Sequence, residues 1–358
     1  MILISVGASS GALAVPAIAR ELAEEGHHVE VILEGEALLF VGPAAFGGAS
    51  LVDEPSETPE AVLFAPATTD TLARLGRGLD TSFGKKAILA PDFDAATARH
   101  PAVRENLDLL RADGHLLVEG QNGAMVGADE IVARLLGSLG GPMEGFRVLV
   151  TAGGTREPID SVRFIGNRSS GKMGLAVARE AARRGAEVTV IAANIERGEP
   201  GTESRPVETV DELQAEVLDQ AGRTDALVMA AAVSDFKPSS PVGEKIRRRE
   251  GTTSLELAPT ADVLGAVTEQ YPDLFVVGFA ATHGDPLTDA REKLESKGVD
   301  LVVGNDISGE GVGFGADENE VYVVGREEER FVPRASKQEV ARAILDTMFV
   351  EIEKERQR

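Results

Sequence analysis

Residues 146–193 read FRVLVTAGGTREPIDSVRFIGNRSSGKMGLAVAREAARRGAEVTVIAA, and this stretch indicates the fold. It contains a β-branched apolar run, a long loop rich in Gly, Ser and Arg, an amphipathic segment ending at Gly185, and a second β-branched run. Strands that alternate with helices form parallel sheets with crossover helices, which bind ligands at the carboxyl ends of their strands. We therefore expect a Rossmann-like domain here, with a binding site in the long loop.

The chain begins with the same order of segments. Residues 1–33 read MILISVGASSGALAVPAIARELAEEGHHVEVIL. They repeat the order of an apolar run, a Gly/Ser loop, an amphipathic helix and a second apolar run, and Gly26 follows the helix. Between the halves, GSLGGPMEG at residues 137–145 concentrates Gly and Pro, as linkers do. A chain of 358 residues is also too long for one core of ordinary size. The fold class predicted is α/β, with two Rossmann-like doubly wound domains of mainly parallel sheets, a first domain over 1–140, a linker over 137–145 and a second domain over 146–358.

Shorter patterns predict further elements in both halves. In the first half, AVLFAPATTDTLARLGRG at 61–78 indicates a strand and then a helix beginning near Thr69, and KKAILAPDFD at 85–94 indicates a strand. In the second half, four segments read as strands and SKQEVARAILDTMF at 336–349 reads as a capped helix. The four are ALVMAAAVSDF at 226–236, LFVVGFAA at 274–281, DLVVGNDIS at 300–308 and NEVYVVG at 319–325.

Composition excludes several classes of function. The net charge of −23 would repel nucleic acid and anionic membranes, so we expect neither as a partner. The absence of Cys rules out disulfides, thiolate metal sites and thiol catalysis. No apolar run reaches the roughly 18 residues of a membrane span, and the N-terminus lacks the order of a signal peptide, so we expect a cytoplasmic protein. The nine lysines against 27 arginines fit either a salt-adapted cytoplasm or drift in base composition.

The segment FIGNRSSGKMG, residues 164–174, resembles a phosphate-binding loop but departs from it. Gly166, Gly171 and Lys172 satisfy G-x-x-x-x-G-K, whereas Met173 stands where a Walker loop needs a hydroxyl for Mg²⁺. A helix N-terminus with free backbone N–H groups suits an anion. The alternatives are a phosphate site without Walker geometry and a loop that only turns. The candidate nucleotide-binding residues of this loop are Gly153, Gly154, Ser169, Ser170, Gly171 and Lys172.

Cations that would complete a polyanion site lie elsewhere in the second half. Lys245 lies in EKIRR, and Lys293 and Lys297 lie in REKLESK at a spacing that places both on one helical face. Two like charges at this spacing repel each other unless a polyanion lies between them. The alternative is a solvated face on which Glu292 and Glu295 balance the lysines.

Six separated motifs in order, over about residues 146–348, resemble the ligase half of a bifunctional coenzyme A biosynthesis family, phosphopantothenoylcysteine decarboxylase / phosphopantothenate-cysteine ligase. They are VLVTAGGTREPIDSVRFIGNRSSGKMG, AAVSDFKP, EKIRR, VVGFAA, KLESKGVDLVVGNDIS and GFGADENEV. The resemblance implies CTP as a substrate, Mg²⁺, and ligation of cysteine to 4'-phosphopantothenate through an acyl-cytidylate. It also implies ligase domains paired in a homo-oligomer. Nothing in the spacing distinguishes CTP from ATP.

The resemblance also implies roles for particular residues. Asn167 would handle the acyl-cytidylate as a catalytic residue, and Lys245 would act with it at the nucleotide. Other positions that match nucleotide contacts of the family are Ala231, Ala232, Asp235, Phe279, Lys293 and Lys297. The family usually continues GFAA with Glu-Thr, whereas this chain has Thr282 and His283. That departure leaves local substrate or metal contacts open, and the metal ligands are not assigned.

Residues 1–140 resemble the flavin-dependent decarboxylase half more loosely. Ser9, Ser10 and Thr68 are the candidates for binding the phosphate of FMN. In that family a His, an Asn in PAMN and a Cys take part in decarboxylation. Here SLVDEPSETPEAV at 50–62 has no His, residues 92–94 read Asp-Phe-Asp, and Cys is absent.

Our main interpretation is therefore a ligase whose first domain is inactive as a decarboxylase. The alternatives are a fully bifunctional FMN-dependent enzyme and a non-catalytic nucleotide sensor. The loops do not match G-x-G-x-x-G, which argues against a nicotinamide or flavin oxidoreductase.

Overall fold

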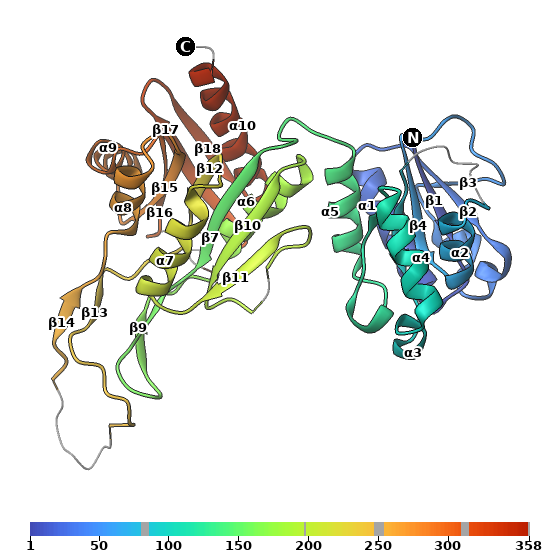
Figure 1. Ribbon diagram of the computed structural model, residues 1–358. Coiled ribbons are helices and arrows are strands. Elements are labelled where there is room, and N and C mark those ends of the chain that lie inside the picture. Colours follow the sequence, from blue (N-terminus) through green and yellow to red (C-terminus); the bar gives the residue numbers. More distant parts are fainter. Residues whose placement is uncertain (80–85, 197, 247–253, 309–314, 357–358) are drawn as a thin grey trace. The chain divides into compact units, whose positions relative to one another are not determined.

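The computed structural model describes residues 1–79, 86–196, 198–246, 254–308 and 315–356 (Figure 1). The chain divides into two compact units, Met1–Gly140 and Gly141–Arg358. We call them unit 1 and unit 2 and describe each by itself. No helix in the described part of the chain is both long and apolar enough to cross a membrane.

Unit 1 is built on a six-stranded parallel sheet in the order β3-β2-β1-β4-β5-β6. Its strands are β1 (Ile2–Val6), β2 (Val29–Leu33), β3 (Ser50–Leu51), β4 (Ala61–Ala67), β5 (Ile88–Pro91) and β6 (Leu116–Leu117). Its α-helices are α1 (Val15–Glu24), α2 (Thr69–Gly76), α3 (Ala95–Ala98), α4 (Pro101–Ala112) and α5 (Ala128–Ser138).

Both faces of the unit 1 sheet are covered. Side chains of β1 alternate, so that Ile2 and Ile4 pack in a cluster with α1 and α5, whereas Leu3 packs in a cluster with α2 and α4. Because successive side chains of a strand point to opposite faces, this alternation buries the strand on both sides. The helix predicted near Thr69 begins there, capped by the Thr68 side chain.

Unit 2 is built on an eight-stranded sheet in the order β11-β10-β7-β12-β15-β16-β17-β18. The first six strands in this order are parallel: β11 (Glu203–Val207), β10 (Glu187–Ala193), β7 (Arg147–Gly153), β12 (Ala226–Met229), β15 (Phe275–Thr282) and β16 (Leu301–Asp306). The last two, β17 (Glu318–Gly325) and β18 (Glu329–Ser336), are antiparallel. The predicted α/β class with two doubly wound, mainly parallel domains is confirmed.

Helices cover both faces of this sheet as well. One core cluster packs α6 (Lys172–Arg183) and α10 (Lys337–Arg356) against the sheet. The other packs α7 (Val210–Ala221), α8 (Val263–Gln270) and α9 (Pro286–Lys297) against the opposite face. The predicted cap of α10 is present, because Glu339 N–H donates to Ser336 Oγ and the Glu339 carboxylate accepts from Ser336 N–H.

Two small hairpins that sequence patterns did not predict extend from unit 2. They are β8 (Arg156–Pro158) with β9 (Phe164–Gly166), and β13 (Phe236–Pro238) with β14 (Leu257–Pro259). β13 contacts β8, and the two hairpins project from the large sheet (Figure 1). We call them the hairpin arm.

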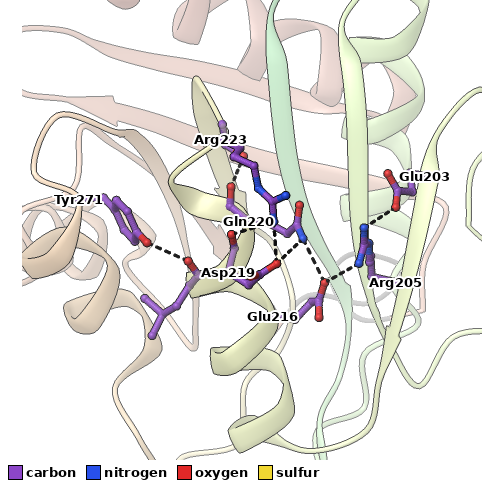
Figure 2. A network of polar contacts seen from close by, with 9 residues as sticks. Glu203, Arg205, Glu216, Asp219, Gln220, Arg223 and Tyr271 are labelled. Carbon is purple, nitrogen blue, oxygen red and sulfur yellow. Dashed lines mark hydrogen bonds and ion pairs between the residues drawn. The ribbon is translucent and has the colours of Figure 1, made fainter.

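A polar network on the surface joins α7 to its neighbours (Figure 2). Arg205 on β11 pairs with Glu216 on α7 at 3.3 Å, and the Tyr271 hydroxyl after α8 donates to the Leu218 carbonyl at 2.9 Å. Exposed ion pairs of this kind contribute about 0–1 kcal/mol each. The network therefore orients these elements more than it stabilises the unit, whose stability comes from the two apolar clusters.

Candidate functional site

A cavity of about 620 Å³ lies at the carboxyl edge of the unit 2 sheet. From β7 the chain continues to β10 on one side and later to β12 on the other, so the order of strands reverses between β7 and β12. Open α/β sheets bind ligands at this switch point because the loops of the two central strands diverge there. The cavity is lined by the loop before α6 and by the residues that follow β12.

The loop after β7 begins with a close approach of two backbones. Gly153 has φ of +93°, and a Cβ at this position would lie 1.9 Å from the Ala193 carbonyl oxygen at the end of β10. Gly171, with φ of +76°, lies directly against Gly153 and is the residue before α6. Both positions need glycine, because a side chain would be strained and would also clash. The two glycines therefore allow the loop to pack directly against the end of β10.

Backbone hydrogen bonds join this loop to the chain after β12. Ala232 N–H donates to the Gly153 carbonyl at 2.9 Å, and Thr155 N–H donates to the Ala232 carbonyl at 3.2 Å. Ala231 N–H donates to Thr151 Oγ1 at 3.1 Å. Ala231 and Ala232 line the cavity as predicted, but their N–H groups are already used within the protein. Any ligand contact through these N–H groups would have to replace an existing hydrogen bond.

Asn167 lies on the cavity wall and is exposed. Its Nδ2 donates to the Val233 carbonyl at 3.0 Å, which ties the loop to the segment after β12. An amide nitrogen carries two N–H donors, and this bond uses one of them. The geometry is compatible with a second donor directed at a ligand, and equally with a residue that only holds the loop in place.

The N-terminus of α6 opens onto the same cavity. Ser169, Ser170, Gly171 and Lys172 all line it. Lys172 Nζ pairs with the exposed Asp317 carboxylate at 2.6 Å and also donates to the Gly315 carbonyl at 3.2 Å. Met173 packs against the unit 2 core, which explains why an apolar residue stands where a Walker loop has a hydroxyl.

A second group of cations enters from α9. Lys293 and Lys297 lie one helical turn apart and both line the cavity. Lys293 Nζ donates to the Phe279 carbonyl at 2.6 Å, and Lys297 Nζ pairs with Asp262 at 2.7 Å. Burial, and then the adjacent Lys297 charge, lower the pKa of Lys293 below the usual 10.5. An anion next to the two ammonium groups would offset both effects and raise the pKa of Lys293.

The structure does not bring all predicted site residues to the cavity. Asp235 and Phe279 line it, whereas Gly153 and Gly154 lie behind the loop. Lys245 is exposed and is not among the described residues of the lining. It lies on the hairpin arm, where Ile246 N–H donates to Asp160 at 3.1 Å.

Among the lining residues that the sequence did not predict, three have side chains that bear on the charge and polarity of the cavity. Asp262 pairs with Lys297, and Asn319 and Lys337 are buried residues of the cavity lining. Asn319 Oδ1 has no hydrogen-bond partner among the described residues. Burial, followed by the charge of Lys172, lowers the pKa of Lys337. The scarcity of lysine was a usable signal, because four of the nine lysines line this one cavity: Lys172, Lys293, Lys297 and Lys337.

The three residues that the resemblance assigns to the FMN phosphate already make contacts within unit 1. The hydroxyls of Ser9 and Ser10 both point at the Asp92 carboxylate, and Thr68 Oγ1 accepts from Thr71 N–H as the cap of α2. The Ser9 and Ser10 hydroxyls therefore already have an acceptor within the protein, and Thr68 Oγ1 lies 3.0 Å from Thr71 Oγ1. We derive no reaction step through FMN.

Mg²⁺ has no protein cage in the described residues, among which no group of three or more His, Cys, Asp or Glu could hold a metal ion. Mg²⁺ bound mainly by nucleotide phosphates and water needs few protein ligands. Asp235 and Asp262 are the carboxylates of the cavity lining, and Asp262 already pairs with Lys297.

Comparisons with known proteins cover both units. Residues 143–351 match the family described as the DNA/pantothenate metabolism flavoprotein C-terminal domain. The chain is 37% identical over 398 aligned positions to the coenzyme A biosynthesis bifunctional protein CoaBC of Mycobacterium tuberculosis, covering 96% of this chain and 95% of that protein. It is 35% identical over 390 positions to CoaBC of Thermococcus kodakarensis, covering 99% and 94%.

Solved structures match unit 2. The C-terminal domain of a CoaBC protein superposes with a TM-score of 0.52 at 31% identity, over 60% of this chain and 98% of that one. The DNA/pantothenate metabolism flavoprotein from Streptococcus pneumoniae shares the fold, with a TM-score of 0.51 at 24% identity over 58% and 100% of the two chains.

Proposed function

Because the chain belongs to the family of coenzyme A biosynthesis bifunctional proteins CoaBC, we propose that unit 2 ligates cysteine to 4'-phosphopantothenate in a CTP-dependent reaction. The observation that supports this best is the cavity at the switch point of the sheet, with a helix N-terminus and four lysines around it. In a chain of net charge −23, such a concentration of cations indicates a polyanionic ligand.

The proposed chemistry has two steps. A carboxylate oxygen of phosphopantothenate attacks the α-phosphorus of CTP, and the bond to pyrophosphate breaks. The cysteine amine then attacks the acyl carbon, the bond to CMP breaks, and the amine loses a proton. Mg²⁺ on the triphosphate would neutralise part of its charge. Lys293, Lys297 and the α6 N-terminus would hold the phosphates, and Asn167 would donate to the oxygen on which charge develops.

Decarboxylation by unit 1 is the second candidate activity. The full-length similarity to bifunctional relatives favours it over our expectation of an inactive first domain, and the comparisons do not support that expectation. Against it stand the missing His, Asn and Cys of the family pattern. A direct assay separates the candidates.

The assay uses the purified full chain with Mg²⁺, 4'-phosphopantothenate and cysteine, and compares CTP with ATP while following pyrophosphate, product mass and CO₂. Amide product with CTP supports the ligase, and its comparison with ATP identifies the nucleotide. Release of CO₂ in addition would establish the bifunctional alternative. Nucleotide binding without pyrophosphate or product would favour a sensor and contradict the proposal.

Lys293→Gln should raise the KM for CTP by about tenfold or more and leave the KM for cysteine nearly unchanged, because a charged hydrogen bond to phosphate is lost. In the unmutated chain the KM for CTP should also rise with pH. The protonated form of Lys293 would bind the triphosphate. The pKa of Lys293 lies below 10.5, so this charge is lost at a lower pH than in an ordinary lysine.

Steady-state kinetics at several alkaline pH values test this, with Lys293→Arg as the matched control. Arginine keeps its charge over this range, so its KM for CTP should vary less with pH. An unchanged KM for CTP in Lys293→Gln would contradict the role of Lys293 in binding the triphosphate.

We also propose that unit 2 pairs with a second copy through the hairpin arm. Six apolar side chains of the arm are exposed by 43–59%, and isolated small hairpins are rarely stable alone. They are Val162, Phe164, Phe236, Val242, Leu255 and Leu257.

Leu257→Glu should convert a dimer into a monomer in sedimentation experiments, because it places a charge in the apolar contact. The matched control is Val350→Glu, which changes an apolar side chain of similar exposure (49%) on α10, away from the arm. A monomeric unmutated chain would contradict this pairing.

A further inference from the structure

Asp92 in unit 1 lies directly after β5, at the carboxyl edge of the six-stranded sheet. Its Oδ2 accepts from Ser9 Oγ at 2.6 Å, from Gly11 N–H at 2.8 Å and from Ser10 Oγ at 3.5 Å. Its Oδ1 accepts from Met125 N–H at 3.2 Å. One carboxylate thus receives the two serine hydroxyls and the Gly11 N–H of the loop after β1, at the start of the helical segment leading to α1.

Donors arranged in this way are those of an anion site. Hydroxyls and N–H groups that converge at the start of a helical segment bind phosphate in many proteins. Here the anion is part of the chain. Burial raises the pKa of Asp92, but hydrogen bonds from Ser9, Gly11 and Met125 outweigh it and leave the pKa below its usual value. Asp92 is therefore ionised near neutral pH.

The space between loop and carboxylate is also filled. A Cβ on Gly11 would lie 2.9 Å from Asp92 Oδ2 and 3.1 Å from its Cγ. A phosphate group is larger than a methyl group and carries the same sign of charge as Asp92. It could reach the donors of Ser9 and Gly11 only if the Asp92 side chain left them.

We propose that Asp92 is a built-in anion that occupies the phosphate position of the loop after β1, so that unit 1 gains no affinity for FMN from the FMN phosphate. The proposal concerns unit 1 alone and does not depend on the ligase activity of unit 2. Asp92 differs in this from Asp94, two residues later, which only caps a helix. Asp94 is exposed and accepts from Ala96 N–H and Thr97 N–H at 2.8 Å as the cap of α3.

The test compares FMN with riboflavin, which is the same flavin without the phosphate. Dissociation constants are measured by flavin fluorescence for the full chain, Asp92→Ala, Asp92→Asn and the control Asp94→Ala. The unmutated chain and Asp94→Ala should bind the two flavins with affinities equal within about threefold. Asp92→Ala should prefer FMN by about tenfold or more, because the vacated donors can then bind phosphate.

Two results would overturn the proposal. One is an unmutated chain that already prefers FMN by about tenfold or more. The other is a folded Asp92→Ala variant with no preference for FMN, including one that binds neither flavin. Thermal unfolding checks that each variant is folded. If Asp92→Ala does not fold, Asp92→Ser, measured in the same way, decides by the same criterion, since its short side chain also takes the carboxylate away from Ser9 and Gly11. Asp92→Asn keeps an oxygen that can accept from Gly11 N–H, so it should prefer FMN less than Asp92→Ala does.

Discussion

Gly153→Ala should destabilise unit 2 by more than about 3 kcal/mol, which makes it the most damaging single methyl addition that we expect. The new Cβ would lie 1.9 Å from the Ala193 carbonyl oxygen and 2.9 Å from its carbon. Gly153 and Ala193 are partners in the register of β7 and β10, so neither backbone can move without breaking the ladder. The φ of +93° adds strain of about 1–2 kcal/mol for any residue with a Cβ.

Urea unfolding followed by tyrosine fluorescence measures this effect. The chain has no Trp, and its two tyrosines, Tyr271 and Tyr322, both lie in unit 2, so the signal reports on unit 2 alone. The matched control is Gly145→Ala. Its φ is +80°, but no described atom lies within 4 Å of the added Cβ, so only the strain term of about 1–2 kcal/mol should appear. Equal losses in the two variants would show that the close approach at Gly153 does not matter.

The parallel sheets could be predicted from sequence because each central strand is a short, continuous apolar run, and because helices with clear ends recur between the strands along the chain. β7, β12, β15 and β16 all coincide with such runs. The hairpin arm could not be predicted, because each of its strands is only three residues long. A strand of that length is too short to show an alternation of apolar and polar residues. The strands are β8, β9, β13 and β14. The single long loop expected before α6 therefore contains the β8–β9 hairpin.

Part of the cavity lining could be predicted, because some of the lining residues belong to local patterns in the sequence. Residues on the loop before α6 belong to one contiguous motif, and the periodicity of α9 places Lys293 and Lys297 on one face. Asn319 and Lys337 reach the same cavity from β17 and the start of α10, and this depends on the antiparallel return of the last two strands. Nothing local in the sequence encodes that return. Asp92 shows the same limit in unit 1, since its partners Ser9 and Gly11 are about eighty residues away.

Asn167→Asp should abolish amide formation while sparing nucleotide activation. If Asn167 donates to the oxygen of the acyl-cytidylate, a carboxylate in its place removes the donor and adds a charge of the wrong sign. Loss of one such donor lowers kcat by about 10²–10³-fold. A burst of about one pyrophosphate per site should persist without cysteine, because the activation step uses the phosphate-binding lysines. Rapid quenching followed by separate counting of pyrophosphate and amide product measures the two steps.

Asn194→Gly distinguishes this role from that of a residue that only holds the loop. The Asn194 side chain donates to the Gly154 and Glu208 carbonyls at 2.9 Å each, so it tethers the same loop without lining the cavity. Its φ of +54° suits glycine, and the substitution removes the tethers without adding backbone strain. If Asn167 only tethers the loop through the Val233 carbonyl, both variants should lose pyrophosphate and amide in equal proportion. A selective loss of amide in Asn167→Asp, with none in Asn194→Gly, requires contact between Asn167 and the reacting group.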